Sequence, residues 1–447
     1  MRPYLRVANV FEDRIDTTDV MEMNFTPEEF ETYRLHHGDI LLNEGQSLEL
    51  VGRPAMFRGE LDGVCFTNSL VRYQAGAPLV QEFALYQFRY WLRSGDFSAI
   101  ANITTNIAHL GAGRFAELKI ALPPVPEQRR IVAKLDELLA RSRRAREELA
   151  EVPALLARYR ESVLAAAFRG DLTADWREAH PEAEPASDVG SWERKRGRAH
   201  IGALLQADEE LPRTWQSVWL GQAATLQVGY AFKSSEFETS GLRLLRGINI
   251  EPGAARWTDT VYIKPQRREE FQEYGLKEGD VVIAMDRPII SSGIKVACLS
   301  ATDVPALLLQ RVGRFRLRSS LSPQFLLLFL NSRSFRDRLE DRATGTQLPH
   351  VSAADIESAR VALPPLAEQR EIVRRIEAAF ARINAIEAAV AAQRAALDAY
   401  DRALLARAFA GELVPQDPAD EPAAALLARL RAERDEAPPT RGRRRRT

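Results

Sequence analysis

The sequence predicts an α+β protein with two mixed α/β globular domains separated by a long antiparallel two-helix coiled coil. First, a segment that begins Leu-Pro-Pro at residue 122 returns at residue 363, and the match continues without a gap for about fifty residues (363 − 122 = 241). Second, each copy has helical apolar periodicity. Third, each copy follows a region of strand and turn signals. Such a repeat indicates a pseudo-twofold molecule that meets its target at two places.

Length and charge set the outer limits. The chain has 447 residues, which suggests about three domains, and 45% of them are apolar, which is enough for folded cores. The 61 Lys and Arg residues nearly cancel the 62 Asp and Glu residues. Global charge therefore neither favours nor excludes a nucleic-acid partner, and any basic surface must be local.

The cysteines and apolar runs bear on compartment. Cys65 and Cys298 stand alone in the sequence, without metal-ligand spacing, which favours two reduced, buried thiols and a cytosolic location. The chain opens without a charged-then-apolar signal segment, and its apolar run at 325–330 is far shorter than the roughly 18 residues of a membrane span. We expect a soluble, cytoplasmic protein without a membrane partner.

The first globular domain is expected over residues 1–121. Residues 35–42 read as a Gly-Asp turn that feeds a strand, and residues 276–283 repeat that pattern (276 − 35 = 241). His109 and His350 share the same offset, whereas the residues between these landmarks differ almost completely. A fixed framework with divergent loops is typical of two domains that read different targets.

Helical spacers are expected over residues 122–172 and 363–413. The double proline suits a helix start, and Gly170 and Gly411 lie where left-handed helix stops are expected. Pro153, which has Arg394 at the equivalent position, predicts a kink or break. The residues expected to form the seam of the coiled coil are Ile131, Leu135, Leu138, Ile372, Ile376, Phe380 and Ile383, with Leu139, Leu149, Leu156, Tyr159, Val163, Ala167, Ile386 and Val390 continuing it.

Three further segments complete the predicted organisation. Residues 173–210 read as a connector with a possible short helix over 191–205, and residues 211–362 as the second globular domain. The tail, 414–447, should contain a short helix and a basic end. Such a charge run is usually solvated, and its functional alternative is loose phosphate contact without sequence information.

The sequence offers no catalytic equipment. It lacks a nucleotide-binding Gly-rich loop with its Lys-Ser/Thr, and the Gly-Ala-Gly at 111–113 is not a dinucleotide fingerprint. The histidines lack zinc-site spacing. His109 and His350 are better explained as structural residues, and Asp39 and Asp280 as turn residues. We therefore expect no catalytic residue, metal or cofactor.

The paired Leu-Pro-Pro-x-x-Glu-Gln-x-x-Ile-Val elements resemble the conserved regions of type I restriction-modification specificity subunits. The segments 170–177, 411–418 and 420–427 fit the same resemblance, which covers nearly the whole chain. It implies a non-catalytic subunit with two target recognition domains, each of which reads half of a split site in double-stranded DNA. The helical spacer would dock two methyltransferase subunits, and a motor and nuclease subunit would join the complex.

The resemblance also implies which loops face DNA. Amide side chains can pair with adenine, Arg with guanine, and Lys or Thr with phosphate. For each residue the alternative is an ordinary surface loop. The expected DNA-binding residues are Tyr230, Lys233, Arg246, Asn249, Thr346 and Gln347 in the second domain and Thr105 and Asn106 in the first.

The first domain departs from the second at its start. Its opening segment aligns with residues 244–250, so about thirty residues present in the second domain have no counterpart (241 − 211 = 30). Either the true start codon lies upstream or the first domain lacks its opening strand and a DNA-facing loop, which would expose an unpaired sheet edge. The alternative function is a truncated or orphan scaffold that docks proteins but has one or no functional DNA-reading domain.

Overall fold

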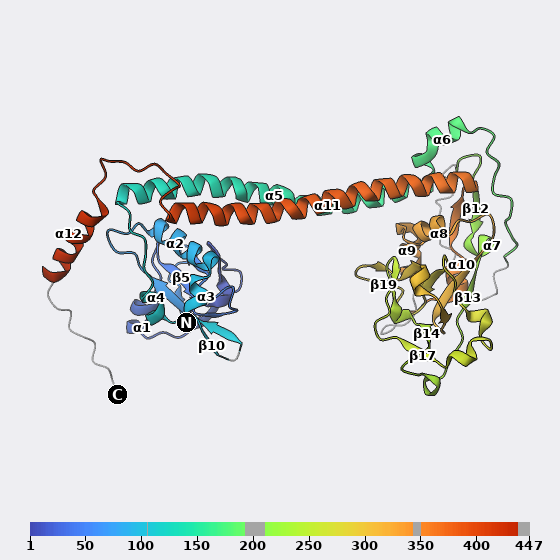
Figure 1. The fold of residues 1–447 in the computed structure, drawn as a ribbon, viewed down its shortest axis with the longest axis horizontal. Helices are drawn as coiled ribbons and strands as arrows, with labels where there is room; N and C mark the ends of the chain where they lie inside the picture. Colours follow the sequence, from blue (N-terminus) through green and yellow to red (C-terminus); the bar gives the residue numbers. More distant parts are fainter. Residues whose placement is uncertain (105, 193–210, 343–349, 437–447) are drawn as a thin grey trace. The chain divides into compact units, whose positions relative to one another are not determined.

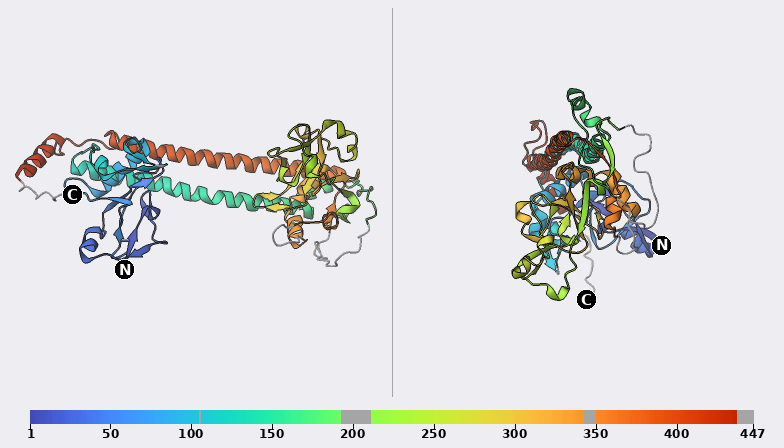
Figure 2. Two further views of the ribbon diagram at one scale, coloured as in Figure 1. Left: turned by 90° about the horizontal axis from the view of Figure 1, so that it is seen from below. Right: turned by 90° about the vertical axis from the view of Figure 1, so that its right-hand side faces the viewer.

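A computed structural model describes residues 1–104, 106–192, 211–342 and 350–436. The chain forms two compact units, one of Met1–Glu151 with Ala389–Thr447 and one of Val152–Ala388. Each unit holds a mixed α/β domain and an antiparallel pair of segments from the helices α5 (Val125–Arg169) and α11 (Leu366–Phe409), coloured teal and orange-red in Figures 1 and 2. The predicted fold class is confirmed. Among the described residues, none of the helices is long and apolar enough to cross a membrane.

The first unit contains these further elements: β1 (Arg2–Leu5), η1 (Val7–Asn9), β2 (Val10–Phe11), β3 (Arg14–Ile15), β4 (Met21–Met23), α1 (Pro27–Tyr33), β5 (Ile40–Asn43), β6 (Gly45–Gln46), β7 (Pro54–Met56), β8 (Cys65–Phe66), β9 (Leu70–Tyr73), α2 (Gln81–Ser94), α3 (Asp96–Ile100), β10 (Asn102–Thr104), β11 (Ile107–His109), α4 (Ala112–Ala116) and α12 (Ala423–Glu436).

The second unit contains η2 (Asp171–Thr173), α6 (Ala174–Ala179), β12 (Gln216–Trp219), α7 (Leu220–Ala223), β13 (Ala224–Val228), η3 (Ser234–Glu236), β14 (Leu242–Leu245), η4 (Gly247–Asn249), β15 (Ile250–Glu251), β16 (Ala254–Ala255), β17 (Val261–Ile263), η5 (Pro265–Arg268), η6 (Gln272–Tyr274), β18 (Val281–Ala284), β19 (Ile289–Ile290), β20 (Gly293–Ile294), β21 (Val296–Cys298), η7 (Ala301–Asp303), β22 (Ala306–Leu308), β23 (Val312–Leu317), α8 (Pro323–Leu330), α9 (Arg333–Arg342), α10 (Ala353–Glu357) and β24 (Arg360–Leu363).

The two domains share their sheet topology. In the first, β1 pairs antiparallel with β4 and parallel with β8, and in the second β14 pairs in the same way with β17 and β22. The order β7-β5-β9 in the first domain corresponds to β21-β18-β23 in the second, where β13 adds a fourth strand beside β23. Within these two sheets the repeat seen in the sequence is therefore a repeat of fold, and among the described residues of the first unit β13 has no counterpart.

The predicted Gly-Asp turns are present at both positions. Gly38 has φ +92° and Gly279 has φ +83°, a left-handed conformation that glycine adopts without steric cost. The Asp39 carboxylate accepts a hydrogen bond from the backbone N–H of His36 at 3.0 Å. Asp280 closes the second turn in the same way on Lys277, at 2.8 Å. These aspartates have the turn role that the sequence indicated.

A repeated arginine network holds the strand after each turn. In the second domain Arg314, on β23, is fully buried. It donates to Asp280 (3.1 Å) and to the backbone oxygens of Gly275 (2.5 Å) and Glu273 (2.7 Å). In the first domain Arg72 donates to the equivalent oxygens of Arg34 (2.9 Å) and Thr32 (3.1 Å) and lies 3.8 Å from Asp39.

The glutamine of each Glu-Gln pair joins the helical spacer to its domain. Gln128 accepts a hydrogen bond from the N–H of Val80 at the start of α2 (2.8 Å), and its amide donates to the oxygens of Pro78 and Pro123. Gln369 makes the same three bonds, with Ser322 at the start of α8 and with the oxygens of Ser320 and Pro364. Both glutamines are fully buried. One side chain therefore fixes two helix starts.

The helix pairs pack through the predicted seam. In the first unit Ile131 and Leu135 of α5 pack with Leu404 and Leu405 of α11. Phe83 of α2 belongs to the same cluster, and helix α2 lies directly beneath the helix pair in Figure 1. Of the seven seam residues, Ile131, Leu135, Ile372, Ile376 and Ile383 are buried, and Leu138 and Phe380 are half-buried. All seven side chains are thus at least half-buried, and their assignment as the coiled-coil and partner-binding residues stays a prediction.

Two residues expected to continue the seam face solvent. Tyr159 is 53% exposed and Ile386 is 45% exposed. Residues spaced three or four apart form an apolar stripe along the helix, and the partner helix covers only part of this stripe. These two side chains lie outside the covered part.

Pro153 does not break its helix, so the expectation of a break was wrong. A proline in a helix interior leaves the carbonyl four residues earlier without its N–H partner. That carbonyl belongs to Leu149, and it accepts a hydrogen bond from the Arg394 guanidinium at 2.9 Å. Arg394 is the repeat equivalent of Pro153 (394 − 153 = 241). The opposite helix thus supplies the missing donor, and α5 continues to Arg169.

The ends of the long helices follow the sequence. Gly170, with φ +92°, and Gly411, with φ +75°, lie just after α5 and α11. The predicted tail helix is present as α12. Most of the possible helix at 191–205 and the basic end from 437 lie outside the described residues. The residue limits proposed for the six sequence segments stay predictions.

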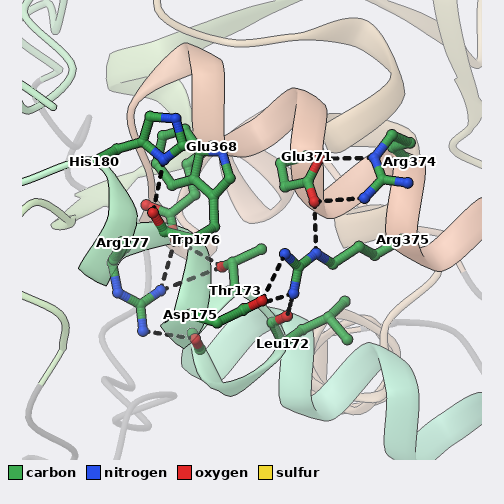
Figure 3. A network of polar contacts seen from close by, with 11 residues as sticks. Leu172, Thr173, Asp175, Trp176, Arg177, His180, Glu368, Glu371, Arg374 and Arg375 are labelled. Carbon is green, nitrogen blue, oxygen red and sulfur yellow. Dashed lines mark hydrogen bonds and ion pairs between the residues drawn. The ribbon is translucent and has the colours of Figure 1, made fainter.

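An ion pair on α11 gives the helix pair of the second unit a dependence on pH. The guanidinium groups of Arg374 and Arg375 hold the pKa of Glu371 at about 2, below its ordinary 4.5 (Figure 3). A depressed carboxyl pKa stabilises the folded state above the ordinary pKa, and this stabilisation is lost as the pH falls toward the folded value. We expect the stability difference between the wild type and Glu371→Gln to shrink from pH 4.5 to about pH 2 in thermal unfolding. Glu377→Gln, at an exposed position of the same helix, is the matched control for the substitution itself.

Candidate nucleic-acid interface

Backbone hydrogen bonds bring several loops of the second domain to one end of its four-stranded sheet. The N–H of Met285, just after β18, donates to the oxygen of Arg311 (2.9 Å), and the N–H of Val351 donates to the oxygen of Met285 (2.9 Å). The N–H of Ala284 donates to the oxygen of Lys295, also at 2.9 Å. Segments separated by more than fifty residues in the sequence therefore meet at the end of β18.

Tyr230 lies beside this end of the sheet. Its N–H donates to Leu308 (3.1 Å) and its oxygen accepts from Gln310 (2.8 Å). The preceding Gly229 lies so close to Leu309 that a Cβ atom would be 2.3 Å from the Leu309 carbonyl, so only glycine fits.

The Tyr230 ring rests on a rigid aromatic base and keeps one surface open. It packs against Phe232, Phe271 and Tyr274 at centroid distances of 4.9, 4.8 and 5.5 Å, and Tyr230 remains 40% exposed. A fixed ring with an open edge can contact a nucleotide at little entropic cost.

The loop at η4 corrects one predicted contact. Asn249 is fully buried. Its amide oxygen accepts from the N–H of Arg246, and its nitrogen donates to the oxygens of Arg256 and Thr258. Its hydrogen bonds are thus used to shape the loop, and it cannot contact DNA from this position. Asn9 makes the equivalent bonds in the first domain, with Arg6, Asp16 and Asp19.

The same loop exposes a side chain that sequence reasoning missed. Ile248, beside Asn249, is 61% exposed. Arg246 is half-buried, and one of its amino groups donates to the backbone oxygen of Asp259. Lys233, on the loop after Tyr230, is exposed, and its N–H donates to Glu236 at 2.7 Å.

Further cations that sequence reasoning missed lie around the η4 loop. Arg287 and Arg311 are exposed, and both have positive φ (+44° and +71°). A Cβ atom on Gly247 would lie 3.9 Å from both the Lys295 ammonium nitrogen and the Arg311 oxygen. Burial lowers the pKa of Lys295, Asp286 opposes this shift and Arg287 adds to it. A phosphate could pair with these cations, of which Arg311 also lies 3.8 Å from the Asp286 carboxylate.

In the first domain the residues just before His109, the repeat equivalent of His350, form a hairpin of β10 and β11. Asn106 lies exposed at its turn with φ +70°, flanked by Ile103 (59% exposed) and Ile107 (48% exposed). β11 pairs with β6 through His109 and Gly45. The bridge between Asp286 and His350 in the second domain has the same register. Both domains therefore form a bridge at the same pair of repeat positions.

Three predicted residues, Thr105, Thr346 and Gln347, lie outside the described residues. The structure thus places Tyr230 and Arg246 at the same end of the sheet. Asn249 is buried there, so its side chain is not among the exposed groups. Among the residues it describes, no group of three or more His, Cys, Asp or Glu side chains could hold a metal ion.

Comparison with known proteins identifies relatives. The specificity subunit of the EcoAI enzyme of Escherichia coli is 38% identical over 179 residues, which is 40% of this chain and 30% of that protein. The MjaVIII specificity subunit of Methanocaldococcus jannaschii is 29% identical over 278 residues, 61% of this chain and 58% of that protein. The chain thus spans less than two thirds of these two relatives. For the EcoKI specificity subunit of Escherichia coli strain K12, identity is 26% over 97% of this chain and 88% of that protein.

Solved structures show a similar fold. The HsdS subunit from Thermoanaerobacter tengcongensis has a TM-score of 0.57 at 22% identity, covering 92% of this chain and 91% of that one. A chain from a study of assembly and conformational transition of the type I restriction-modification system has a TM-score of 0.66 at 20% identity, covering 92% of both chains. The model of the type I restriction modification DNA specificity domain matches residues 14–154 and 212–393. The chain therefore belongs to the type I restriction-modification DNA specificity family.

Proposed function

We propose that this chain is the DNA-sequence specificity subunit of a type I restriction-modification complex, and that each globular domain reads one half of a bipartite site in double-stranded DNA. The observation that carries the proposal is the shared frame of the two domains, in which equivalent positions pair (His109 with Gly45, His350 with Asp286) while the residues between the shared positions differ in sequence. A conserved frame fixes position, whereas divergent loops select different bases. Family membership supports the same function.

The contacts follow from side-chain chemistry. In the second domain Arg246, Lys233, Lys295 and Arg311 would bind phosphates or guanine, and the Tyr230 ring would pack against a nucleotide. Thr346 and Gln347, with Thr105 and Asn106 in the first domain, would read base edges or phosphates. Asn249 has a positioning role, because its hydrogen bonds hold the backbone of the Arg246 loop.

The helical spacer would dock the partner subunits. The two spacers repeat at one offset in sequence, so they can present similar surfaces to two methyltransferase subunits. A motor and nuclease subunit would join through the assembled complex. The specificity subunit itself would carry no catalysis and no cofactor, and it would act in the cytoplasm, where its DNA target lies.

Adenine-methylation mapping tests the proposed function. The full chain is expressed with its neighbouring methyltransferase in a host without other adenine methylation, and modified sites are mapped across the genome. We expect a split motif with two unlike half-sites and a fixed gap. Absence of methylation would support the alternative, a protein-docking scaffold. A single repeated half-site would mean that only one domain reads DNA.

The cations around the η4 loop, Arg287, Lys295 and Arg311, give a second test. Arg311→Gln should weaken binding of the assembled complex to its target several-fold and reduce the salt dependence of binding by about one phosphate contact. Arg333→Gln, which removes an exposed arginine on α9, is the matched control and should leave both quantities unchanged. Equal effects of the two substitutions in a fluorescence-anisotropy titration would remove Arg311 from the interface.

A further inference from the structure

Exposed apolar side chains gather at one end of the four-stranded sheet of the second domain. Within the described residues of 211–362, the most exposed large apolar side chains are Val228 (36%), Tyr230 (40%) and Ile248 (61%). Apolar side chains that are exposed singly are ordinary, whereas apolar surface that gathers at one place marks a site of contact. The positions of these three residues in the fold therefore matter.

All three residues are attached to one short segment, residues 308–313. Val228 ends β13 and pairs with the second residue of β23. The backbone of Tyr230 makes two hydrogen bonds to the segment, of 3.1 and 2.8 Å. A Cβ atom on Gly247, which precedes Ile248 in η4, would lie 3.9 Å from a backbone oxygen of the segment. The three exposed apolar groups therefore belong to one surface.

The turn that presents Ile248 is fixed from within. The next residue, Asn249, is fully buried, and its side chain ties the N–H of Arg246 to two backbone oxygens of the loop beyond the turn. The N–H of Asn249 also donates to the oxygen of Arg246 at 2.9 Å. Behind the turn, a Cβ atom on Gly247 would lie 3.6 Å from the Ala284 Cβ atom at the end of β18. A β-branched side chain on a backbone held in this way has little freedom to lose on binding.

The repeat keeps this turn and changes its exposed residue. In the first domain the buried Asn9 accepts a hydrogen bond from the N–H of Arg6 at 3.0 Å, as its equivalent does in the second domain. The residue before the buried asparagine is Ala8 in the first domain and Ile248 in the second, and both are exposed. A constant turn that carries a different exposed residue in each domain is suited to select different bases from the same position.

Cations surround the exposed isoleucine. The Lys295 ammonium nitrogen would lie 3.9 Å from a Cβ atom on Gly247, and Arg311 is exposed beside it. Such cations bind phosphates and position a duplex, but they carry no sequence information. Isoleucine has no hydrogen-bond donor or acceptor in its side chain, so it can recognise only an apolar feature of a base. In the major groove that feature is the 5-methyl group of thymine.

We propose that Ile248 is a specificity-determining residue that packs on the 5-methyl group of a thymine, in the major groove of the half-site read by the second domain. This inference rests on the proposed DNA-reading function and adds to it a base and a chemical group. Tyr230, on the same surface, packs against a neighbouring nucleotide, and Lys295 and Arg311 hold the flanking phosphates. Ala8 is too short to reach as far from the same backbone, so the two half-sites differ at this position.

Deoxyuridine is the probe, because it differs from thymidine only in lacking the 5-methyl group. Once methylation mapping has given the site, each thymine of both half-sites is replaced in turn, and the affinity of the assembled complex is measured by fluorescence anisotropy. At one thymine we expect the affinity of the wild type to fall about fourfold, the effect of one buried methyl group. The complex that carries Ile248→Ala should bind the thymine and deoxyuridine duplexes equally at that position.

Ile386→Ala is the matched control. It shortens an isoleucine that is 45% exposed on α11, and its complex should keep the difference of about fourfold between the two duplexes. Thermal unfolding checks the fold of both variants. Because the Ile248 side chain is 61% exposed, Ile248→Ala should leave the melting temperature unchanged.

The outcomes separate this contact from DNA reading itself. A preference for one thymine that Ile248→Ala abolishes supports the proposal. Equal affinity of the wild type for every deoxyuridine duplex, or a preference that survives in Ile248→Ala, overturns the proposal and leaves the DNA-reading function standing. A uniform loss of affinity in Ile248→Ala with an unchanged thymine preference also overturns it, and would make the side chain a wedge between base pairs. Absence of any specific binding by the wild type would overturn the DNA-reading function, and this contact with it.

Discussion

Replacing Arg314 with methionine is expected to lower the free energy of unfolding of the second unit by about 3–5 kcal/mol. The guanidinium is fully buried and binds Asp280, the side chain of Gln227 and the backbone oxygens of Gly275 and Glu273. Methionine fills a similar volume but leaves these acceptors without donors in a region closed to water. Chemical denaturation followed by circular dichroism measures the loss.

Arg72→Met is the matched control in the same chain. Arg72 makes the equivalent bonds, but its side chain is 21% exposed, so water can replace part of what is lost. We expect its effect to be smaller, by at least about 1 kcal/mol. An equal loss at both positions would show that β13, which lies beside β23, does not change the environment of the arginine.

Replacing Ile383 with aspartate should separate the helix pair of the second unit. Ile383 is 1% exposed on α11, and the substitution buries a charge without a partner. We expect a loss of about 4 kcal/mol or more and loss of methyltransferase recruitment in a pull-down with the full chain. Phe380→Asp should cost less, because Phe380 is half-buried.

Ile386→Asp offers the control for this change, with the same residue types one helical turn away. Ile386 is 45% exposed, so aspartate there stays in water and should change stability by less than about 0.5 kcal/mol. Normal methyltransferase recruitment by the Ile383 variant would contradict the proposal that the helix pair is the docking spacer.

Much of the fold could be predicted because its signals are local or repeated. The 241-residue offset revealed two copies, and the double prolines and Gly170 and Gly411 marked the ends of the long helices. The buried role of Asn249 could not be predicted, because an amide can bond equally well to a base or to its own loop. The persistence of the helix through Pro153 depends on Arg394, which lies more than two hundred residues away in sequence.

The candidate site was predicted only through the family resemblance, which pointed to the loop that carries Tyr230. Lys295 and Arg311 reach the site only through long-range backbone hydrogen bonds. The positive φ of Arg311 carries no signal in the residue type itself. A buried arginine such as Arg314 is also invisible in sequence, because arginine is usually a surface residue.

The first unit is made of two segments that lie far apart in the sequence, so during synthesis it cannot complete its core until the second segment has been made. Its helix pair joins Leu139 to Leu404, so 265 residues are made between the two sides of one core (404 − 139 = 265). At roughly 5–20 residues per second, this apolar surface stays uncovered for about 13–50 s on each ribosome. The second unit, which is continuous, can finish its core first. The nascent first unit is therefore the part of the chain expected to need a chaperone.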